Sequence, residues 1–250
     1  MNPSTRIKGE DETQDTFYHG RILVLQKRKG YRFSVDAPLL ADFILTSESD
    51  RLLEIGTGSG VISLLLSIKS FRHITALEIQ DSLADLARRN VRLNGLTSRI
   101  RIVQADVRDF SSKEKFDVVF SNPPYIGRKA GHLSTSREKS IAKHELKCTL
   151  FDIMQRTAEL MKEEGRAYFV YPAKRRMDFM RALEESGLRL RALRLVFSHK
   201  TGEASLFLAS CGFRAEKERH LPPLVLFERE GKYSEEAEEI FAGRIHAAIV

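Results

Sequence analysis

The sequence contains few of the features that mark secreted or membrane proteins. It has only two cysteines, Cys148 and Cys211, and they form no C-x-x-C pair. Two cysteines are too few for a disulfide framework, which favours a reducing compartment. No apolar run approaches the ~20 residues that a membrane-spanning helix needs. The chain also starts with a polar, acidic stretch that does not resemble a secretory signal. We therefore expect a soluble, cytoplasmic protein.

Metal-ligand spacing, internal repeats, low-complexity tracts and interdomain linkers are absent as well. The seven histidines and two cysteines show no arrangement typical of a metal site, so we expect no bound metal. A chain of 250 residues that is 42% hydrophobic and 30% charged can bury a real core as one large domain. The net charge of +7 suggests an acidic partner, and nucleic acid is the commonest one.

From residue 51 onward, short apolar runs alternate with amphipathic segments. This pattern is typical of successive βαβ units and a parallel sheet. We expect strands at 51–55, 73–78, 99–103, 116–121, 166–171, 189–197 and 204–211, and helices at 60–69, 81–94, 149–163, 174–186 and 233–242. The last two strands are close enough in sequence to pair antiparallel. The polar, basic segment 126–147 has no sustained period and is expected to be a mobile loop.

The N-terminal part is expected to differ from this core. Residues 1–16 lack periodicity and are interpreted as a flexible leader. Residues 21–26 and 31–34 flank a Lys29-Gly30 turn and are predicted to form a hairpin, and a helix should follow from Asp36. We expect an α/β fold with a mostly parallel, seven-stranded, Rossmann-like sheet covered by helices on both faces. Its single domain would span residues 17–250, with the hairpin and helix in 17–50 and the core in 51–250.

A glycine-rich turn follows the first strand of this core, in the stretch 52–60, LLEIGTGSG. Gly56, Gly58 and Gly60 allow positive φ and let a ligand approach the backbone closely, while the next helix directs free N–H groups at it. The spacing G-x-G-x-G departs from the dinucleotide fingerprint. Glu54 would repel a pyrophosphate, but it would favour a cation. S-adenosylmethionine, which carries a sulfonium and an ammonium, therefore suits the turn better than NAD.

Two further acidic residues end the next two strands. Glu78 is placed to accept hydrogen bonds from both ribose hydroxyls of a nucleotide, and Asp106 from an adenine amino group. We expect their neighbours Ile79 and Val107, together with Thr57 of the turn, to complete the cofactor site.

The tetrapeptide Asn122-Pro123-Pro124-Tyr125 follows the strand at 116–121. The Asn122 side-chain carbonyl and the Pro123 main-chain carbonyl can accept the two hydrogens of a planar amino group, which frees its lone pair for attack on a methyl group. The two prolines stiffen the turn, so that both carbonyls stay aimed. Tyr125 can stack on a planar substrate.

Together these motifs resemble the class I S-adenosylmethionine-dependent methyltransferases whose N-P-P-Y motif marks methylation of planar nitrogens. The segment 26–41, QKRKGYRFSVDAPLLA, is similar to that of bacterial tRNA (adenine-N6)-methyltransferases, which modify the adenosine beside the anticodon of a valine tRNA. The resemblance implies that the segment from Tyr31 to Asp36 covers the methionine end of the cofactor, with Tyr31 and Phe33 among the cofactor-binding residues. It also implies that Asn122 contacts the cofactor and that tRNA is the substrate.

The motif defines the nucleophile and leaves the molecule that carries it open. Adenine in RNA, adenine in DNA and a protein glutamine amide all qualify, and a non-catalytic RNA-binding module that retains the pocket is a further alternative. Basic residues around the expected site favour RNA, whose unpaired bases are easily splayed out. These are Lys27, Arg28, Lys29, Arg32, Arg128, Lys129, Arg137, Lys139, Lys143, Lys147, Lys174, Arg175 and Arg176.

Overall fold

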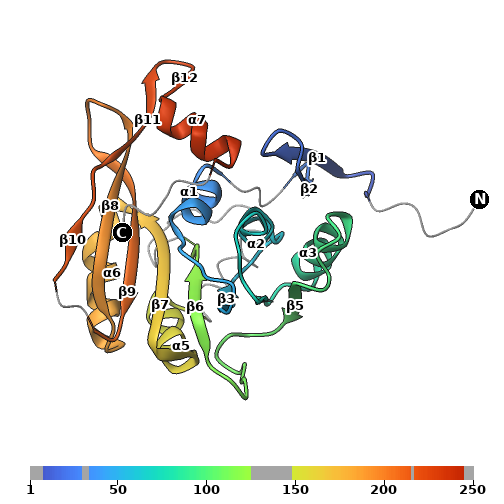
Figure 1. Ribbon diagram of the computed structural model, residues 1–250, viewed down its shortest axis with the longest axis horizontal. Helices are drawn as coiled ribbons and strands as arrows, with labels where there is room; N and C mark the ends of the chain where they lie inside the picture. Colours follow the sequence, from blue (N-terminus) through green and yellow to red (C-terminus); the bar gives the residue numbers. More distant parts are fainter. Residues whose placement is uncertain (1–7, 30–33, 125–147, 215–216, 245–250) are drawn as a thin grey trace, which may run out of the picture.

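The fold centres on one ten-stranded sheet, shown in Figure 1, with strand order β12-β11-β8-β9-β7-β6-β3-β4-β5 and β10 paired to β8. The computed structural model describes residues 8–29, 34–124, 148–214 and 217–244. The expected α/β class is confirmed. The sheet has more strands than the seven we expected, because three short strands near the C-terminus join its far edge.

The first half of the sheet is parallel. Its strands are β3 (Arg51–Ile55), β4 (His73–Glu78), β5 (Ile100–Gln104), β6 (Phe116–Ser121) and β7 (Met161–Pro172). They pair in the order β5-β4-β3-β6-β7, so their carboxyl ends meet at one edge of the sheet. In an open sheet of this kind, this edge is where ligands bind.

The second half begins where β9 (Ala204–Gly212) pairs antiparallel with both β7 and β8 (Arg189–His199). β10 (Arg219–His220) and β11 (Leu224–Arg229) then pair in parallel with β8, and β12 (Lys232–Tyr233) closes the edge. β10 and β12 contain two residues each, too few for any alternation of polar and apolar residues to be visible in the sequence.

Helices cover both faces of the sheet. One face packs against α1 (Asp36–Phe43), α2 (Val61–Leu66), α3 (Asp81–Leu93) and α7 (Glu235–Ala242), and the other against α5 (Leu150–Leu160) and α6 (Arg176–Glu185), which the 3-10 turn Ala173–Arg175 precedes. Neighbouring residues of one strand therefore enter different cores: Leu52 packs on the first face and Leu53 on the second. Burial on both faces explains why these strands are continuous apolar runs.

The N-terminal hairpin differs from our expectation. It consists of β1 (Glu12–Phe17) and β2 (Ile22–Lys27), paired antiparallel around a turn in which Tyr18, His19 and Gly20 have positive φ. The sequence placed residues 12–16 in a leader and paired 21–26 with 31–34, of which 31–33 lie outside the described residues. The presence of an N-terminal antiparallel hairpin is confirmed, but the leader assignment of residues 12–16 was wrong, because β1 is polar throughout except for Phe17 and its most buried residue is the charged Glu12.

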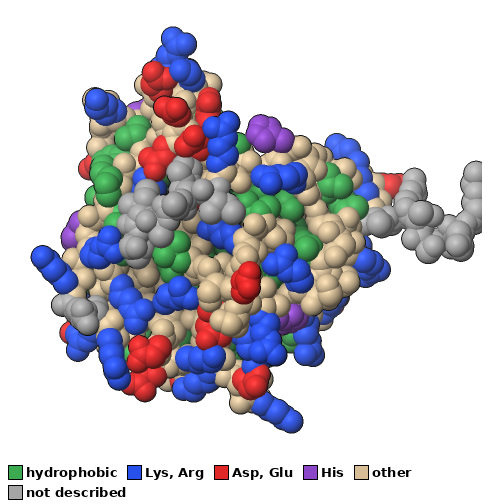
Figure 2. Space-filling view, viewed as in Figure 1, with side chains coloured by type: hydrophobic (Ala, Val, Ile, Leu, Met, Phe, Trp, Pro, Cys, Tyr) green, Lys and Arg blue, Asp and Glu red, His purple; other side chains and the backbone are tan. Residues whose placement is uncertain are grey.

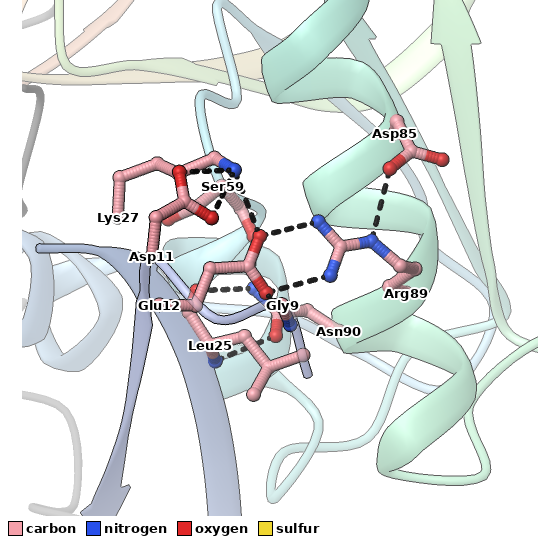
Figure 3. Close-up of polar contacts among 9 residues, drawn as sticks. All are labelled: Gly9, Asp11, Glu12, Leu25, Lys27, Ser59, Asp85, Arg89 and Asn90. Atoms are coloured by element: carbon pink, nitrogen blue, oxygen red, sulfur yellow. Dashed lines mark hydrogen bonds and ion pairs between the residues drawn. The ribbon is translucent and has the colours of Figure 1, made fainter. Parts of the chain in front are cut away.

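Ion pairs dock this hairpin on α3, at the end of the molecule away from β8 and β9 (Figures 1 and 3). Glu12 is 1% exposed, and its two carboxylate oxygens accept hydrogen bonds of 2.7 and 2.8 Å from the Arg89 guanidinium. The Lys27 ammonium lies 3.0 Å from the same carboxylate. The hydrogen bonds from Arg89 dominate, and they lower the pKa of Glu12 from 4.5 to about 2.

Within the described residues, no helix is long and apolar enough to cross a membrane.

The depressed pKa of Glu12 predicts how stability depends on pH. The ionised carboxylate contributes stability above pH 4.5, and this contribution is lost as the pH falls toward about 2. Glu12→Gln should therefore lower the free energy of unfolding at pH 7 by roughly 3 kcal/mol. The difference from the wild type should shrink between pH 4.5 and the lowest pH at which the protein folds, as measured by urea unfolding.

Asp85→Asn is the matched control, because Asp85 also binds Arg89 but its side chain is 59% exposed. This exposed pair should contribute less than about 1 kcal/mol. A loss in Glu12→Gln that did not change with pH would show that packing of the hairpin, and not the charge of Glu12, stabilises the contact.

A candidate cofactor site at the carboxyl edge of the sheet

The glycine turn between β3 and α2 has the conformation that the sequence predicted. Gly56, Gly58 and Gly60 have φ values of 74°, 59° and 86°, which L side chains rarely adopt. The amides of Gly56 and Thr57 donate hydrogen bonds of 3.0 and 2.8 Å to the carbonyl of Leu77 in β4. The turn is therefore held against the end of the neighbouring strand.

Two of these glycines are needed for different reasons. A Cβ at Gly60 would lie 3.3 Å from the Cβ of Ala87, so this glycine lets the start of α2 approach α3 closely. A Cβ at Gly56 would meet nothing within 4 Å, so Gly56 presents bare backbone at the edge of the sheet, where a ligand can approach.

Glu54 lies beneath the turn and is 1% exposed. Its Oε2 atom accepts a hydrogen bond of 2.6 Å from the Thr57 hydroxyl and another from the Ser63 hydroxyl. Burial raises the pKa of Glu54 from 4.5 to about 7, although both hydroxyls favour the charged form. The carboxyl group thus connects Thr57 of the turn to Ser63 of α2 through hydrogen bonds.

Glu78, the last residue of β4, is fixed by two main-chain amides. Its Oε2 accepts a 2.8 Å hydrogen bond from Gly58 of the glycine turn, and its Oε1 accepts one of 2.8 Å from Gln80. Ile79 between them is half-buried. A carboxylate held in this way retains lone pairs for further donors, so it fits the predicted role as acceptor for ribose hydroxyls.

Asp106 and Val107 follow β5, the next strand. The Asp106 carboxylate accepts hydrogen bonds from the main chain and from the guanidinium of Arg108. Val107 is buried, and its carbonyl accepts a 2.9 Å hydrogen bond from Arg156. An adenine amino group at Asp106 would therefore have to share this carboxylate with Arg108, a partner that the sequence did not suggest.

Asn90 of α3 connects the glycine turn to the N-terminal hairpin, and sequence analysis missed it. This residue is fully buried. Its side-chain amide donates to the carbonyls of Ser59 and Leu25 at 2.9 and 3.0 Å and accepts a 2.7 Å hydrogen bond from the Leu25 amide (Figure 3). An asparagine on the apolar face of a helix was the available signal, because a buried amide needs partners.

Asn122 lies beside the turn. Ile55 and Ser121 are paired in the sheet, so Gly56 and Asn122 follow directly on adjacent strands, which lie about 5 Å apart. The Ser121 hydroxyl donates a 2.7 Å hydrogen bond to the Ile55 carbonyl and ties the two strand ends together. The Asn122 side-chain nitrogen donates a 3.0 Å hydrogen bond to Asp36, a contact that the sequence did not indicate.

The predicted site residues are thus gathered at one edge of the sheet as far as the structure describes them. Pro123 is buried behind Asn122, and Pro124 is exposed. Tyr31, Phe33 and Tyr125 lie outside the described residues, as does the segment 126–147.

The charge of the site fits a cationic ligand. The carboxyl groups of Glu54 and Glu78 both contact the glycine turn, and the amides of Gly56, Thr57 and Gly58 already donate to Leu77 and Glu78, so a pyrophosphate would be repelled there. A sulfonium with an ammonium group would be attracted. Among the residues that the structure describes, no group of three or more His, Cys, Asp and Glu could hold a metal ion.

Solved structures share this fold. A predicted O-methyltransferase from Agrobacterium tumefaciens superposes with a TM-score of 0.65 over 86% of this chain and 99% of that chain, at 20% identity. TYW2 of M. jannaschii, solved in complex with AdoMet, superposes with a TM-score of 0.55 over 82% of this chain and 87% of that chain, at 17% identity. These superpositions show that the chain has the Rossmann-like fold of class I methyltransferases.

The sequence comparisons agree. The family model for the methyltransferase small domain matches residues 32–193, more than half of the chain, so the protein belongs to that family. Two curated relatives are both named tRNA1(Val) (adenine(37)-N6)-methyltransferase. The relative from Bacteroides thetaiotaomicron is 32% identical over 62% of this chain and 66% of its own. The relative from Dyadobacter fermentans is 26% identical over 86% of this chain and 90% of its own. This chain is a methyltransferase, and S-adenosylmethionine is its cofactor.

The raised pKa of Glu54 predicts a second pH dependence, opposite in sign to that of Glu12. Between pH 4.5 and about 7 the folded protein retains a proton that the unfolded chain has released. The free energy of unfolding of the cofactor-free protein should therefore fall across this window by roughly 3 kcal/mol on account of Glu54. Glu54→Gln cannot titrate and should lack this component.

Urea unfolding at pH 5, 6, 7 and 8 measures the difference, and Asp81→Asn, an exposed acid at the start of α3, serves as the control that should follow the wild type. Parallel pH profiles of Glu54→Gln and the wild type would contradict a raised pKa of the Glu54 carboxyl group.

Proposed function

We propose that this methyltransferase transfers the methyl group of S-adenosylmethionine to the exocyclic N6 of an adenine in tRNA, in the anticodon loop. The observation that carries the proposal is the position of Asn122 and Pro123 directly beside Gly56, on the strand next to the glycine turn. The names of the curated relatives support tRNA and N6 as the targets.

On the cofactor side, we propose that Glu78 binds the ribose hydroxyls and that Asp106 accepts from the adenine amino group. The bare main chain of Gly56, Thr57 and Gly58 would lie against the methionine end. Its sulfonium supplies an electrophilic methyl group. Ile79 and Val107 would flank the adenine, Gly60 keeps α2 in place, and the charge of Glu54 would favour the cation from below. Tyr31 and Phe33 would cover the methionine end, next to Asn122.

On the substrate side, the chain's own carbonyls prepare the nucleophile. The Oδ1 atom of Asn122 and the carbonyl of Pro123 accept the two N6 hydrogens and draw the planar nitrogen toward a tetrahedral shape. The lone pair then forms the new N–C bond as the S–C bond breaks. The methylated nitrogen afterwards gives one of its protons to solvent. Pro123 and Pro124 keep the main chain rigid, and Tyr125 would stack on the base.

Of the basic residues that the sequence assigned to the substrate, Lys174 is the one described residue that we propose to contact a phosphate group. Lys174 follows β7 at the same edge as Asn122, and its side chain is 83% exposed, 3.8 Å from the equally exposed Glu203. Lys27, by contrast, pairs with Asp11 and Glu12, so it belongs to the docking of the hairpin. Figure 2 shows lysines and arginines spread over one face with acidic side chains among them, and no continuous basic stripe.

We further propose that the enzyme works in the cytoplasm as one methyltransferase domain. The hairpin belongs to that domain, because Glu12 and Asn90 join it to α3 and to the glycine turn.

The test is incubation with radiolabelled S-adenosylmethionine and three acceptors: unmodified total tRNA, a protein extract and duplex DNA. Nucleoside analysis of the labelled pool should find N6-methyladenosine in the tRNA. Asn122→Ala should reduce this transfer at least a hundredfold, about 3 kcal/mol, and largely keep its cofactor binding. Radiolabel found in protein glutamine or in DNA, and not in tRNA, would refute tRNA as the substrate. Unchanged turnover in Asn122→Ala would refute the mechanism, and cofactor binding without any transfer by the wild type would favour the RNA-binding alternative.

The proposed role of Glu78 makes a separate prediction. Glu78→Gln keeps the size of the side chain but has one acceptor oxygen for two main-chain amides and for the ribose. Its affinity for S-adenosylmethionine should be at least tenfold weaker, about 1.4 kcal/mol, by calorimetry. Asp81→Asn removes the same charge three residues away and should bind normally. Equal affinities in the two variants would place the ribose elsewhere.

A further inference from the structure

Asp36, the first residue of α1, ends the segment that the sequence analysis places over the methionine end of the cofactor. It is a buried acid, and the proposed reaction gives its carboxyl group no role. Its side chain is only 5% exposed. Its Oδ2 atom accepts the 3.0 Å hydrogen bond from the Asn122 side-chain nitrogen, 86 residues away in sequence, and its Oδ1 accepts from the Ser34 hydroxyl.

An ordinary role at the start of a helix does not account for this contact. Acidic residues are common in first turns because they interact favourably with the helix dipole, and they do so from exposed positions. α1 has no side-chain hydrogen bond at its N-cap, Val35. The carboxylate of Asp36 is turned inward, toward the residue that follows β6.

The hydrogen bond determines which way the Asn122 amide faces. An ionised carboxylate has acceptors only, so the end of the amide that meets Asp36 must be its NH2 group. The carbonyl oxygen of the amide lies on the other side of the same planar group and is therefore turned away from Asp36. In the opposite orientation, two acceptors would face each other at Asp36, and the amide would present N–H groups to an incoming amine.

We propose that Asp36 is a positioning residue for methyl transfer, one that fixes the Asn122 amide with its oxygen toward the substrate nitrogen. The proposal rests on the proposed function, because it assigns Asn122 Oδ1 as the acceptor. A charge-assisted hydrogen bond to the amide nitrogen also increases the electron density on that oxygen. Both effects strengthen the interaction with an amine that becomes positive as the methyl group is transferred.

Asp36 and Asn122 both lie at the ends of rigid elements, α1 and β6. Ala37, Leu39 and Leu40, which follow Asp36 in α1, are each at most 1% exposed in the core. The end of β6 is fixed by the hydrogen bond from Ser121 to Ile55. A hydrogen bond between two such fixed elements can hold an orientation at little cost in entropy.

A double-mutant cycle tests the proposal, with Asp36→Ala, Asn122→Ala and the double variant assayed on the acceptor that the wild type methylates. Asp36→Ala should lower kcat between tenfold and a hundredfold, change KM less than threefold and leave cofactor affinity unchanged. Because Asp36 acts through Asn122, the double variant should be no slower than Asn122→Ala alone. Asp36→Asn retains an acceptor oxygen, but its own amide can also face Asn122 with its N–H groups. Its kcat should therefore fall between those of the wild type and Asp36→Ala.

Glu48→Gln is the control, because Glu48 is an exposed acid in the loop after α1, and its kcat should equal that of the wild type. A wild-type kcat in Asp36→Ala would overturn the proposal. So would a double variant slower by the product of the two single losses, since Asp36 would then act independently of Asn122.

A measurement without substrate separates this proposal from the identity of the acceptor. In 15N-labelled protein, the side-chain amide signal of Asn122 is assigned by its absence in Asn122→Ala. The signal should move upfield in Asp36→Ala, and it should move less in Asp36→Asn, which retains an acceptor oxygen. A signal that neither variant shifts would refute the hydrogen bond. Failure to methylate tRNA would refute the proposed substrate alone.

Discussion

The site depends on a glycine-rich turn that is stabilised by neighbouring elements and not by its own hydrogen bonds. Three left-handed residues within five positions leave the stretch 56–60 with few hydrogen bonds of its own. Neighbouring elements supply them: β4 through the Leu77 carbonyl and Glu78, and α3 through Asn90. The turn is consequently as rigid as the sheet and helix that flank it, and the backbone that a cofactor would meet is fixed before binding.

The same turn concentrates negative charge. Glu54 is buried beneath it and Glu78 beside it, and burial, with a smaller contribution from the nearby Glu78, raises the pKa of Glu54. Such an arrangement is unfavourable in the cofactor-free protein, and a cationic ligand relieves it. The charge therefore distinguishes this site from the dinucleotide sites of similar sheets, where helix N-termini and glycines meet phosphate groups.

Strand pairing sets the distance between the glycine turn and Asn122. Gly56 and Asn122 each follow the last paired residue of adjacent strands, so the spacing of the sheet itself holds the two halves of the site together. α1 adds Asp36 from above one strand end, and α3 adds Asn90 from the other side of the turn. Helices on one face of the sheet thus orient side chains at its edge, while the strands fix the distance between them.

The sequence by itself determined the strands and motifs that local chemistry specifies. The strands 51–55, 73–78 and 116–121 were predicted to the residue, because an apolar run bounded by turn residues is what burial on both faces requires. The positive φ of the three glycines and the place of Asn122 at a strand end followed in the same way.

Tertiary structure alone decided the contacts between distant segments. β1 is a polar strand that pairs with β2 and whose Glu12 binds Arg89 of α3, and β10 and β12 are two-residue strands that pair with longer strands. Asp36 contacts Asn122, which is 86 positions away in the sequence. Asn90 contacts Ser59 and Leu25, which are 31 and 65 positions away. No local sequence pattern predicts such pairs. The packing of helices on the sheet determines which buried polar groups come within hydrogen-bonding distance.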